Sequence, residues 1–244
     1  MSSCIWPQSP DARSGPKTPK PTFHQNVIAT YNLLESMRLR GVAEIAFTST
    51  STVYGEAGIV PTPEGYGPLL PISLYGASKL ACEALISAFC GTFDMRSWIF
   101  RFANIVGDRG THGVIVDFIN KLTASPAELL ILGSGRQRKS YLLVDDCIEA
   151  MVYAVARAGG RVNVFNVGSA DSVDVTEIAD VVVEKMKLSG VRYRYTGGIE
   201  GRGWRGDVRT MLLSIEALEE LGWRPKYSSR ESIERAAEAL LRPR

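Results

Sequence analysis

Apolar residues recur along the chain with a helical period in some segments and in short continuous runs in others. The first clear pattern starts at Asn26, after which Val27, Ile28, Tyr31, Leu33, Leu34 and Met37 follow a helical spacing that stops at Gly41. Residues 44–48 then have the length and apolar character of a buried strand. A helix followed by a strand is half of an α/β repeat.

The same alternation continues to the end of the chain. Helices are predicted over residues 74–93, 113–123, 145–157 and 175–187, followed by two final helices around Leu218 and Ala236. Strands are predicted over residues 97–102, 129–132, 140–144, 163–167, 191–195 and 208–212. Strands separated by helices predict an α/β fold with a mainly parallel sheet and helices on both faces. The first 22 residues contain five prolines, which predicts an irregular segment over 1–22.

Composition narrows the class of protein. With 244 residues, 45% of them hydrophobic, the chain can bury a large core, and a net charge of +2 gives no argument for a nucleic-acid or membrane partner. The four cysteines form no Cys-x-x-Cys pair and only two histidines are present, so we expect no metal site and reduced thiols. No apolar run reaches the ~18 residues of a membrane span, and the start lacks the apolar core of a signal peptide. A soluble, cytoplasmic protein is expected.

The segment 75–79, Tyr-Gly-Ala-Ser-Lys, is the strongest candidate for chemistry. Positions i and i+4 share a helix face, so the Lys79 ammonium is expected to lie beside the Tyr75 phenol and to lower its pKa toward the working pH. Such a phenol can exchange a proton with a sugar or alcohol hydroxyl. Thr50 ends the preceding strand in a hydroxyl-rich run, at the sheet edge where open α/β folds bind ligands.

Further polar groups follow later strands. Asn104 comes after the strand 97–102, a basic run from Arg136 to Lys139 follows a Gly-Ser-Gly turn, and residues 202–207 read Arg-Gly-Trp-Arg-Gly-Asp. Arginine and lysine bind phosphate oxygens, so the basic run favours an anionic ligand over a solvated loop.

This ordered set of motifs, from about residue 25 to residue 225, resembles the extended short-chain dehydrogenase/reductase superfamily and, within it, the nucleotide-sugar epimerases of UDP-glucose 4-epimerase type. The resemblance implies NAD as cofactor and a nucleotide sugar as substrate. It implies catalytic roles for Thr50, Tyr75 and Lys79, cofactor contacts from Asn26, Ser49, Thr50, Tyr75, Lys79 and Ala103, and substrate contacts from Thr50, Tyr75, Asn104, Arg138, Lys139, Arg202, Arg205 and Asp207. For Asn26, a helix N-terminal cap is an equal alternative.

The resemblance also implies a domain division, with a partial, truncated Rossmann-like nucleotide-binding domain over 23–107 and 141–168 and a smaller substrate domain over 108–140 and 169–244. Two departures stand out. Lys139-Ser140 replaces the usual Arg-Asp, and Trp204 stands where many of these epimerases have a phosphate-binding arginine. A homodimer through a four-helix interface, made by the helices near Asn32 and Ala81, is a further expectation.

The reaction follows by exclusion. Relatives that dehydrate or decarboxylate nucleotide sugars have carboxylates where this chain has Ser51 and Thr52, and these hydroxyls are not proton donors near neutral pH. Epimerisation by transient oxidation at a sugar carbon is therefore favoured, and a reductase with the same residues stays open.

The Gly-rich turn that binds the cofactor pyrophosphate is missing. The one literal match to Gly-x-Gly-x-x-Gly, residues 201–206, precedes a predicted strand and is rejected as a cofactor loop. By comparison with the family, the chain begins partway through the nucleotide-binding domain. Two hypotheses follow: an NAD-dependent epimerase whose missing strands belong to a longer protein or to a partner, and a non-catalytic remnant that acts as a nucleotide-sugar-binding or interaction module.

Overall fold

The computed structural model describes residues 3–5 and 19–242, and these residues form two compact units. Unit 1 contains the described residues up to Phe102, together with Ala150–Val167 and Ser214–Trp223. Unit 2 contains Ala103–Glu149, Gly168–Leu213 and the described residues from Arg224. Compared with the predicted division, residues 103–107, 141–149 and 168 lie in unit 2 and residues 214–223 lie in unit 1. Among the described residues, no helix has both the length and the apolar character needed to cross a membrane.

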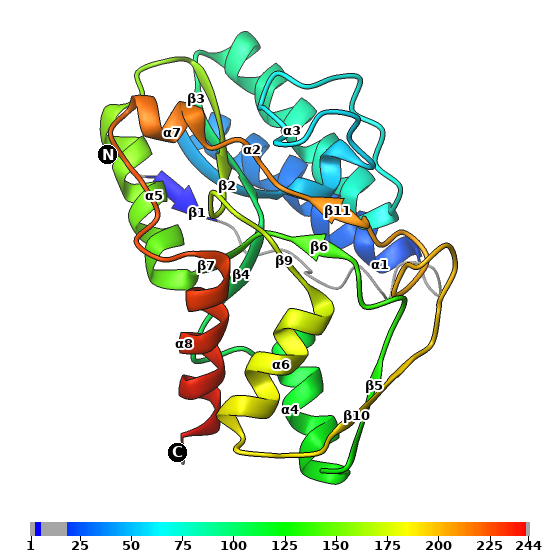
Figure 1. Cartoon of the computed structure of the whole chain (residues 1–244). Coiled ribbons are helices and arrows are strands. Elements are labelled where there is room, and N and C mark those ends of the chain that lie inside the picture. Colours follow the sequence, from blue (N-terminus) through cyan, green and yellow to red (C-terminus); the bar gives the residue numbers. More distant parts are fainter. Residues whose placement is uncertain (1–2, 6–18, 243–244) are drawn as a thin grey trace. The chain divides into compact units, whose positions relative to one another are not determined.

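Unit 1 is built on a parallel sheet in the order β1-β2-β3-β8 (Figure 1). Its strands are β1 (Ser3–Ile5), β2 (Glu44–Thr50), β3 (Arg96–Phe102) and β8 (Val162–Val167). The other elements are α1 (Pro19–Phe23), the π-helix η1 (His24–Ile28), α2 (Ala29–Arg40), the 3-10 helix η2 (Ser51–Tyr54), α3 (Leu74–Phe93) and α7 (Glu216–Glu220). The helix α5 (Val144–Arg157) crosses from unit 2 into unit 1.

Both faces of this sheet are buried. On one face Phe47 and Ile99 pack with Leu34 of α2 and Ile86 of α3 in one apolar cluster. Neighbouring strand residues point to the opposite face, where Trp98 and Phe100 are at most 2% exposed, and Figure 1 shows α5 on that side. The predicted parallel sheet with helices on both faces is therefore confirmed.

Unit 2 contains shorter strands around a helical core. Its elements are β4 (Asn104–Val106), α4 (Val114–Ala124), β5 (Glu128–Ile131), β6 (Arg138–Lys139), β7 (Tyr141–Leu143), β9 (Val173–Asp174), α6 (Val175–Lys185), β10 (Arg192–Tyr195), β11 (Thr210–Met211) and α8 (Ser229–Leu241). Strands β4 and β7 pair in parallel, as do β5 and β10, whereas β6 lies between β11 and the antiparallel β9. Phe118 of α4, Ile178 of α6 and Ile233 of α8 share one apolar cluster.

One prediction about local structure needs correction, and another is confirmed. The segment 1–22 was expected to be irregular, but Ser3–Ile5 pairs with β2 and Pro19 begins a helix. Proline is tolerated at the first helical position because its missing N–H has no helical partner there. The rest of that segment lies outside the described residues. The rejection of residues 201–206 as a cofactor loop is confirmed, because they form turns that lead to β11 and not to a helix.

Candidate active site

The end of β2 turns sharply, and this turn fixes Thr50. Thr50 is the N-terminal cap of η2, and its Oγ1 accepts a hydrogen bond from the backbone N of Thr52 at 3.2 Å. The two threonine hydroxyl oxygens are 3.1 Å apart. Thr50 is 8% exposed, so its hydroxyl is held in one place at the carboxyl end of the sheet.

The first turn of α3 packs directly on this corner. Ser73 caps the helix by accepting a hydrogen bond from the backbone N of Gly76 at 3.0 Å. A Cβ at Gly76 would lie 2.7 Å from the backbone oxygen of Thr52, so only glycine allows this approach. Tyr75, the neighbouring residue, makes a side-chain hydrogen bond with Thr50.

Lys79 lies one helical turn beyond Tyr75 and is only 3% exposed. Its Nζ donates to the backbone oxygen of Thr48 at 2.7 Å and lies 4.9 Å from the centre of the Phe47 ring and 5.9 Å from that of Tyr75. An ammonium has three donors, so this nitrogen retains the capacity to bind a ligand hydroxyl. The structure therefore brings Thr50, Tyr75 and Lys79 together.

The protonation of this cluster differs from the expectation. Burial raises the pKa of Tyr75 to about 12, which its hydrogen bond with Thr50 only partly opposes. Burial lowers the pKa of Lys79 to about 8, against the attraction of Cys82 and Glu83. The expected lowering of the Tyr75 pKa by Lys79 is therefore opposed by desolvation of the phenolate, which is the largest influence on this phenol.

The residues predicted to contact the cofactor lie in different places. Asn26 is fully buried inside η1, which excludes the alternative that it caps a helix, and its Nδ2 donates to the Ser78 hydroxyl of α3 at 2.8 Å. Ser49 donates its hydroxyl to Glu83, further along α3. Ala103 is buried at the start of unit 2.

Unit 2 contains a separate charged cluster. Lys139 Nζ contacts Asp207 Oδ1 at 2.5 Å and lies 5.2 Å from the centre of the Trp204 ring. Asp207 also accepts a hydrogen bond from the backbone N of Gly203, at 3.0 Å, and its backbone oxygen accepts one from Arg202 Nη1 at 2.6 Å. The predicted residues Lys139, Arg202 and Asp207 are therefore neighbours.

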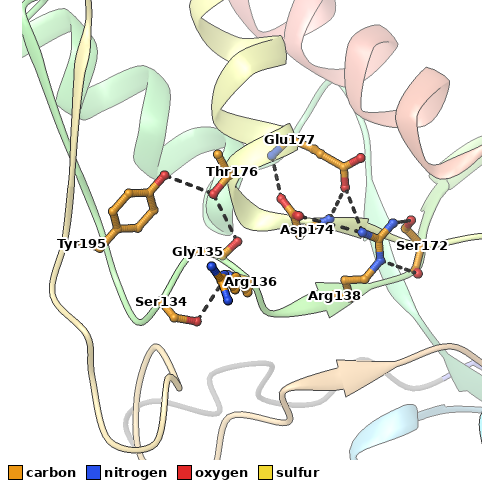
Figure 2. Close-up of polar contacts among 9 residues, drawn as sticks. All are labelled: Ser134, Gly135, Arg136, Arg138, Ser172, Asp174, Thr176, Glu177 and Tyr195. Carbon is orange, nitrogen blue, oxygen red and sulfur yellow. Dashed lines mark hydrogen bonds and ion pairs between the residues drawn. The ribbon is translucent and has the colours of Figure 1, made fainter.

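The other predicted substrate residues are not in that cluster. Arg138 follows the opposite face of β6, and Figure 2 shows its guanidinium directed toward Ser172, Asp174 and Glu177. Its Nη2 donates to the Ser172 backbone oxygen at 2.7 Å. Arg205 is exposed to solvent. Asn104 donates from Nδ2 to the backbone oxygen of Ser140 at 3.1 Å. This bond connects β4 to the residue between β6 and β7.

A pocket of about 460 Å³ lies beside the Gly-Ser-Gly turn formed by residues 133–135. Its lining includes Ser134, Arg136, Thr176 and Tyr195 (Figure 2). A Cβ at Gly135 would lie 2.4 Å from the Tyr195 ring, so this close approach of the ring to the backbone requires glycine. Within residues 3–5 and 19–242, no group of His, Cys, Asp and Glu side chains is arranged to bind a metal ion.

Sequence reasoning missed Glu83 and Arg101, which form a buried ion pair in unit 1, next to the group of Thr50, Tyr75 and Lys79. A signal for Glu83 was available, because it lies four residues after Lys79 and eight after Tyr75 on one helix face. Arg101 gave no such signal, since an arginine inside a strand is not paired with any particular carboxylate by the sequence alone.

Together, a parallel α/β sheet, a threonine at a strand end and a Tyr-x-x-x-Lys pair on the following helix define an enzyme of the short-chain dehydrogenase/reductase class. Residues 10–168 match the model of the NAD dependent epimerase/dehydratase family, and the chain belongs to this family.

Known proteins agree with this assignment. The UDP-glucose 4-epimerase of Mycolicibacterium smegmatis is 31% identical over 219 residues, which cover 87% of this chain and 67% of that protein. The crystal structure of a UDP-galactose 4-epimerase superposes with a TM-score of 0.88 at 39% identity, covering 98% of this chain and 77% of the other. MoeE5 in complex with UDP-glucose and NAD gives a TM-score of 0.86 at 26% identity, covering 98% and 79%.

Proposed function

We propose that this protein is an NAD-dependent epimerase of a UDP-hexose of the UDP-glucose and UDP-galactose type. The observation that carries the proposal is the grouping of Thr50, Tyr75 and Lys79 in unit 1. The similarity to UDP-glucose 4-epimerases supports the choice of substrate.

In this mechanism Tyr75 accepts the proton of the sugar hydroxyl at its phenolic oxygen and later returns it, while the Thr50 hydroxyl holds the same sugar oxygen. Bound NAD supplies a hydride acceptor that can return the hydride to either face of the keto sugar. Lys79 keeps donors for a ribose hydroxyl beside its bond to Thr48, and Asn26 lies buried behind the same helix. These residues fit the ribose end of the dinucleotide. Only the phenolate form of Tyr75 can accept this proton, and populating it near neutral pH requires the pKa to fall from about 12, so ligand binding must favour the phenolate.

The test is conversion of UDP-galactose to UDP-glucose by the purified chain with NAD supplied, followed by chromatography of the two sugars, together with calorimetric titration of NAD. We expect turnover and saturable NAD binding. A folded chain that binds UDP-glucose but neither binds NAD nor turns over would instead support a non-catalytic nucleotide-sugar-binding module. With NADH supplied in place of NAD, its irreversible oxidation together with the formation of a reduced sugar product would support the reductase alternative.

For the diphosphate we propose Lys139 as the main cation. Lys139→Met is expected to weaken binding of UDP about 10- to 100-fold, the value of one charge-assisted hydrogen bond, whereas Arg138→Met should change it less than about threefold. The difference arises because Arg138 points to the other face of β6, toward Ser172 and two carboxylates, whereas Lys139 lies on the side of Asp207 and Arg202. On that side the Lys139 ammonium, which pairs with Asp207, has further donors for a diphosphate oxygen. Calorimetry with UDP measures both. Equal losses in the two variants, or a loss only in Arg138→Met, would contradict the assignment.

We further propose that the protein forms a homodimer through α2 and α3. The Tyr31 side chain of α2 and the Phe93 side chain of α3 are 47% and 43% exposed, and Tyr31 contacts Phe89 edge to face at 6.3 Å. Exposed aromatic side chains on two adjacent helices favour a protein interface. Sedimentation velocity distinguishes a dimer from a monomer.

A further inference from the structure

A buried ion pair joins Glu83, which is on the same helix as Tyr75 and Lys79, to Arg101 of β3. Arg101 Nη2 donates to Glu83 Oε2 at 2.7 Å and Arg101 Nε donates to both carboxylate oxygens, at 3.1 and 3.2 Å. The two side chains are 7% and 6% exposed. Arginine is suited to this arrangement because its planar fork makes several fixed hydrogen bonds at once.

Arg101 also bonds to the segment that follows β2. Its Nη1 donates to the Tyr54 hydroxyl at 2.9 Å and to the backbone oxygen of Glu64 at 3.0 Å. Ser49, next to Thr50 in the sequence, donates its hydroxyl to Glu83 Oε1. One guanidinium on β3 therefore connects α3, η2 and the loop after η2, and its carboxylate partner connects α3 to the end of β2.

The hydrogen-bond network continues to β8 and restricts the movement of η2 and of the loop that follows it. The Tyr54 hydroxyl donates to Asn166 Oδ1 at 2.7 Å, and the backbone N of Asn166 donates to Glu64 Oε1 at 2.9 Å. Asn166 is fully buried and also donates from Nδ2 to the backbone oxygen of Thr62, at 2.9 Å.

A buried ion pair is weak evidence for a contribution to stability, because desolvation offsets much of the attraction. The position of Glu83 on α3 explains this ion pair better than a contribution to stability does. Tyr75, Lys79 and Glu83 are spaced by four residues on α3, so a contact that holds Glu83 also sets how deeply Tyr75 and Lys79 lie against β2 and η2.

We propose that Arg101 and Glu83 are positioning residues, which hold α3 against β2 and η2 and thereby keep Tyr75 and Lys79 in their shared, water-poor environment. The catalytic meaning of that environment rests on the function proposed above. The positioning itself is a property of unit 1 and can be measured without substrate or cofactor.

The experiment is Arg101→Lys in the chain without ligands, with Arg96→Lys as the matched control. Arg96 lies on the same strand, pairs with Glu44 at 3.8 Å and makes no contact with α3 among those described. The readout is the titration of Lys79 by NMR of ¹³C-labelled lysine, assigned with Lys79→Met. Lysine is a single point charge and cannot keep the contacts to Glu83, Tyr54 and Glu64 together.

In Arg101→Lys we expect the pKa of Lys79 to rise from about 8 by about one unit or more toward its ordinary value, because water enters and Glu83 is less neutralised. The value in Arg96→Lys should stay as in the parent protein.

Tyr54→Phe, which removes only the hydroxyl between Arg101 and Asn166, should give a smaller shift of the Lys79 pKa in the same direction. This variant decides the matter if Arg101→Lys does not fold. An unchanged Lys79 titration in the folded Arg101→Lys variant, or in Tyr54→Phe if that is the only one to fold, would overturn the proposal. None of these outcomes depends on turnover, so they stay separate from a failure of the epimerase assay.

Discussion

Tyr75→Phe is expected to lower the rate of epimerisation about 10²- to 10⁴-fold, the usual range for losing a positioned acid or base. The substitution removes one oxygen and keeps the ring, so the packing of α3 on the corner at Thr52 is retained. The KM for the sugar should change far less than kcat, because the phenol is proposed to act mainly on the transferred proton. Steady-state kinetics with UDP-galactose measures both quantities.

Tyr31→Phe is the matched control, since this tyrosine is on α2 and 47% exposed. It should leave kcat unchanged. Retained turnover in Tyr75→Phe at more than about one tenth of the parent rate would remove Tyr75 from the role of acid and base. A similar loss in both variants would indicate damage to the unit and not to the proton transfer.

The helices and strands were largely predictable because each one repeats a local pattern. The helix ending at Gly41 shows this well: the apolar period of α2 stops at a glycine with φ of 67°, a conformation that favours glycine as a helix end. By contrast, β1, β6 and β9 were not predicted, and β11 is shorter than the strand predicted over residues 208–212. Each has only two or three residues, too few for a period to be recognised, and each is defined by its pairing with neighbouring strands.

Side-chain orientation was harder to predict than secondary structure. The basic run was expected to bind one diphosphate, yet adjacent residues of a strand point to opposite faces, which separates Arg138 from Lys139. That separation could have been predicted once the run was recognised as a strand. The environment of Tyr75 could not, because the depth at which its phenol is buried depends on Gly76 meeting Thr52 across a loop of some twenty residues.

Lys79→Met is expected both to abolish efficient turnover and to change how stability depends on pH. In the folded protein burial lowers the pKa of Lys79 to about 8, whereas in the unfolded chain it titrates near its ordinary value of about 10.4. The unfolded state therefore binds more protons than the folded state between these two values. The free energy of unfolding consequently rises with pH across that window, and the penalty for burying the ammonium is complete below it.

Between about pH 7 and about pH 9.5 the Lys79 contribution to the free energy of unfolding should increase by about 2 kcal/mol, and Lys79→Met should lose this increase. Urea unfolding of both proteins at several pH values measures it. Lys20→Met, at an exposed position of α1, should unfold with the same pH dependence as the parent protein. Parallel curves for the parent and Lys79→Met would mean that the ammonium is solvated in the folded state, and Lys79 would then be no part of a buried cluster with Tyr75. If Lys79→Met instead loses both the pH-dependent increase in stability and the activity, the result would link the low dielectric around this amine to the proton transfer that the cluster is proposed to perform.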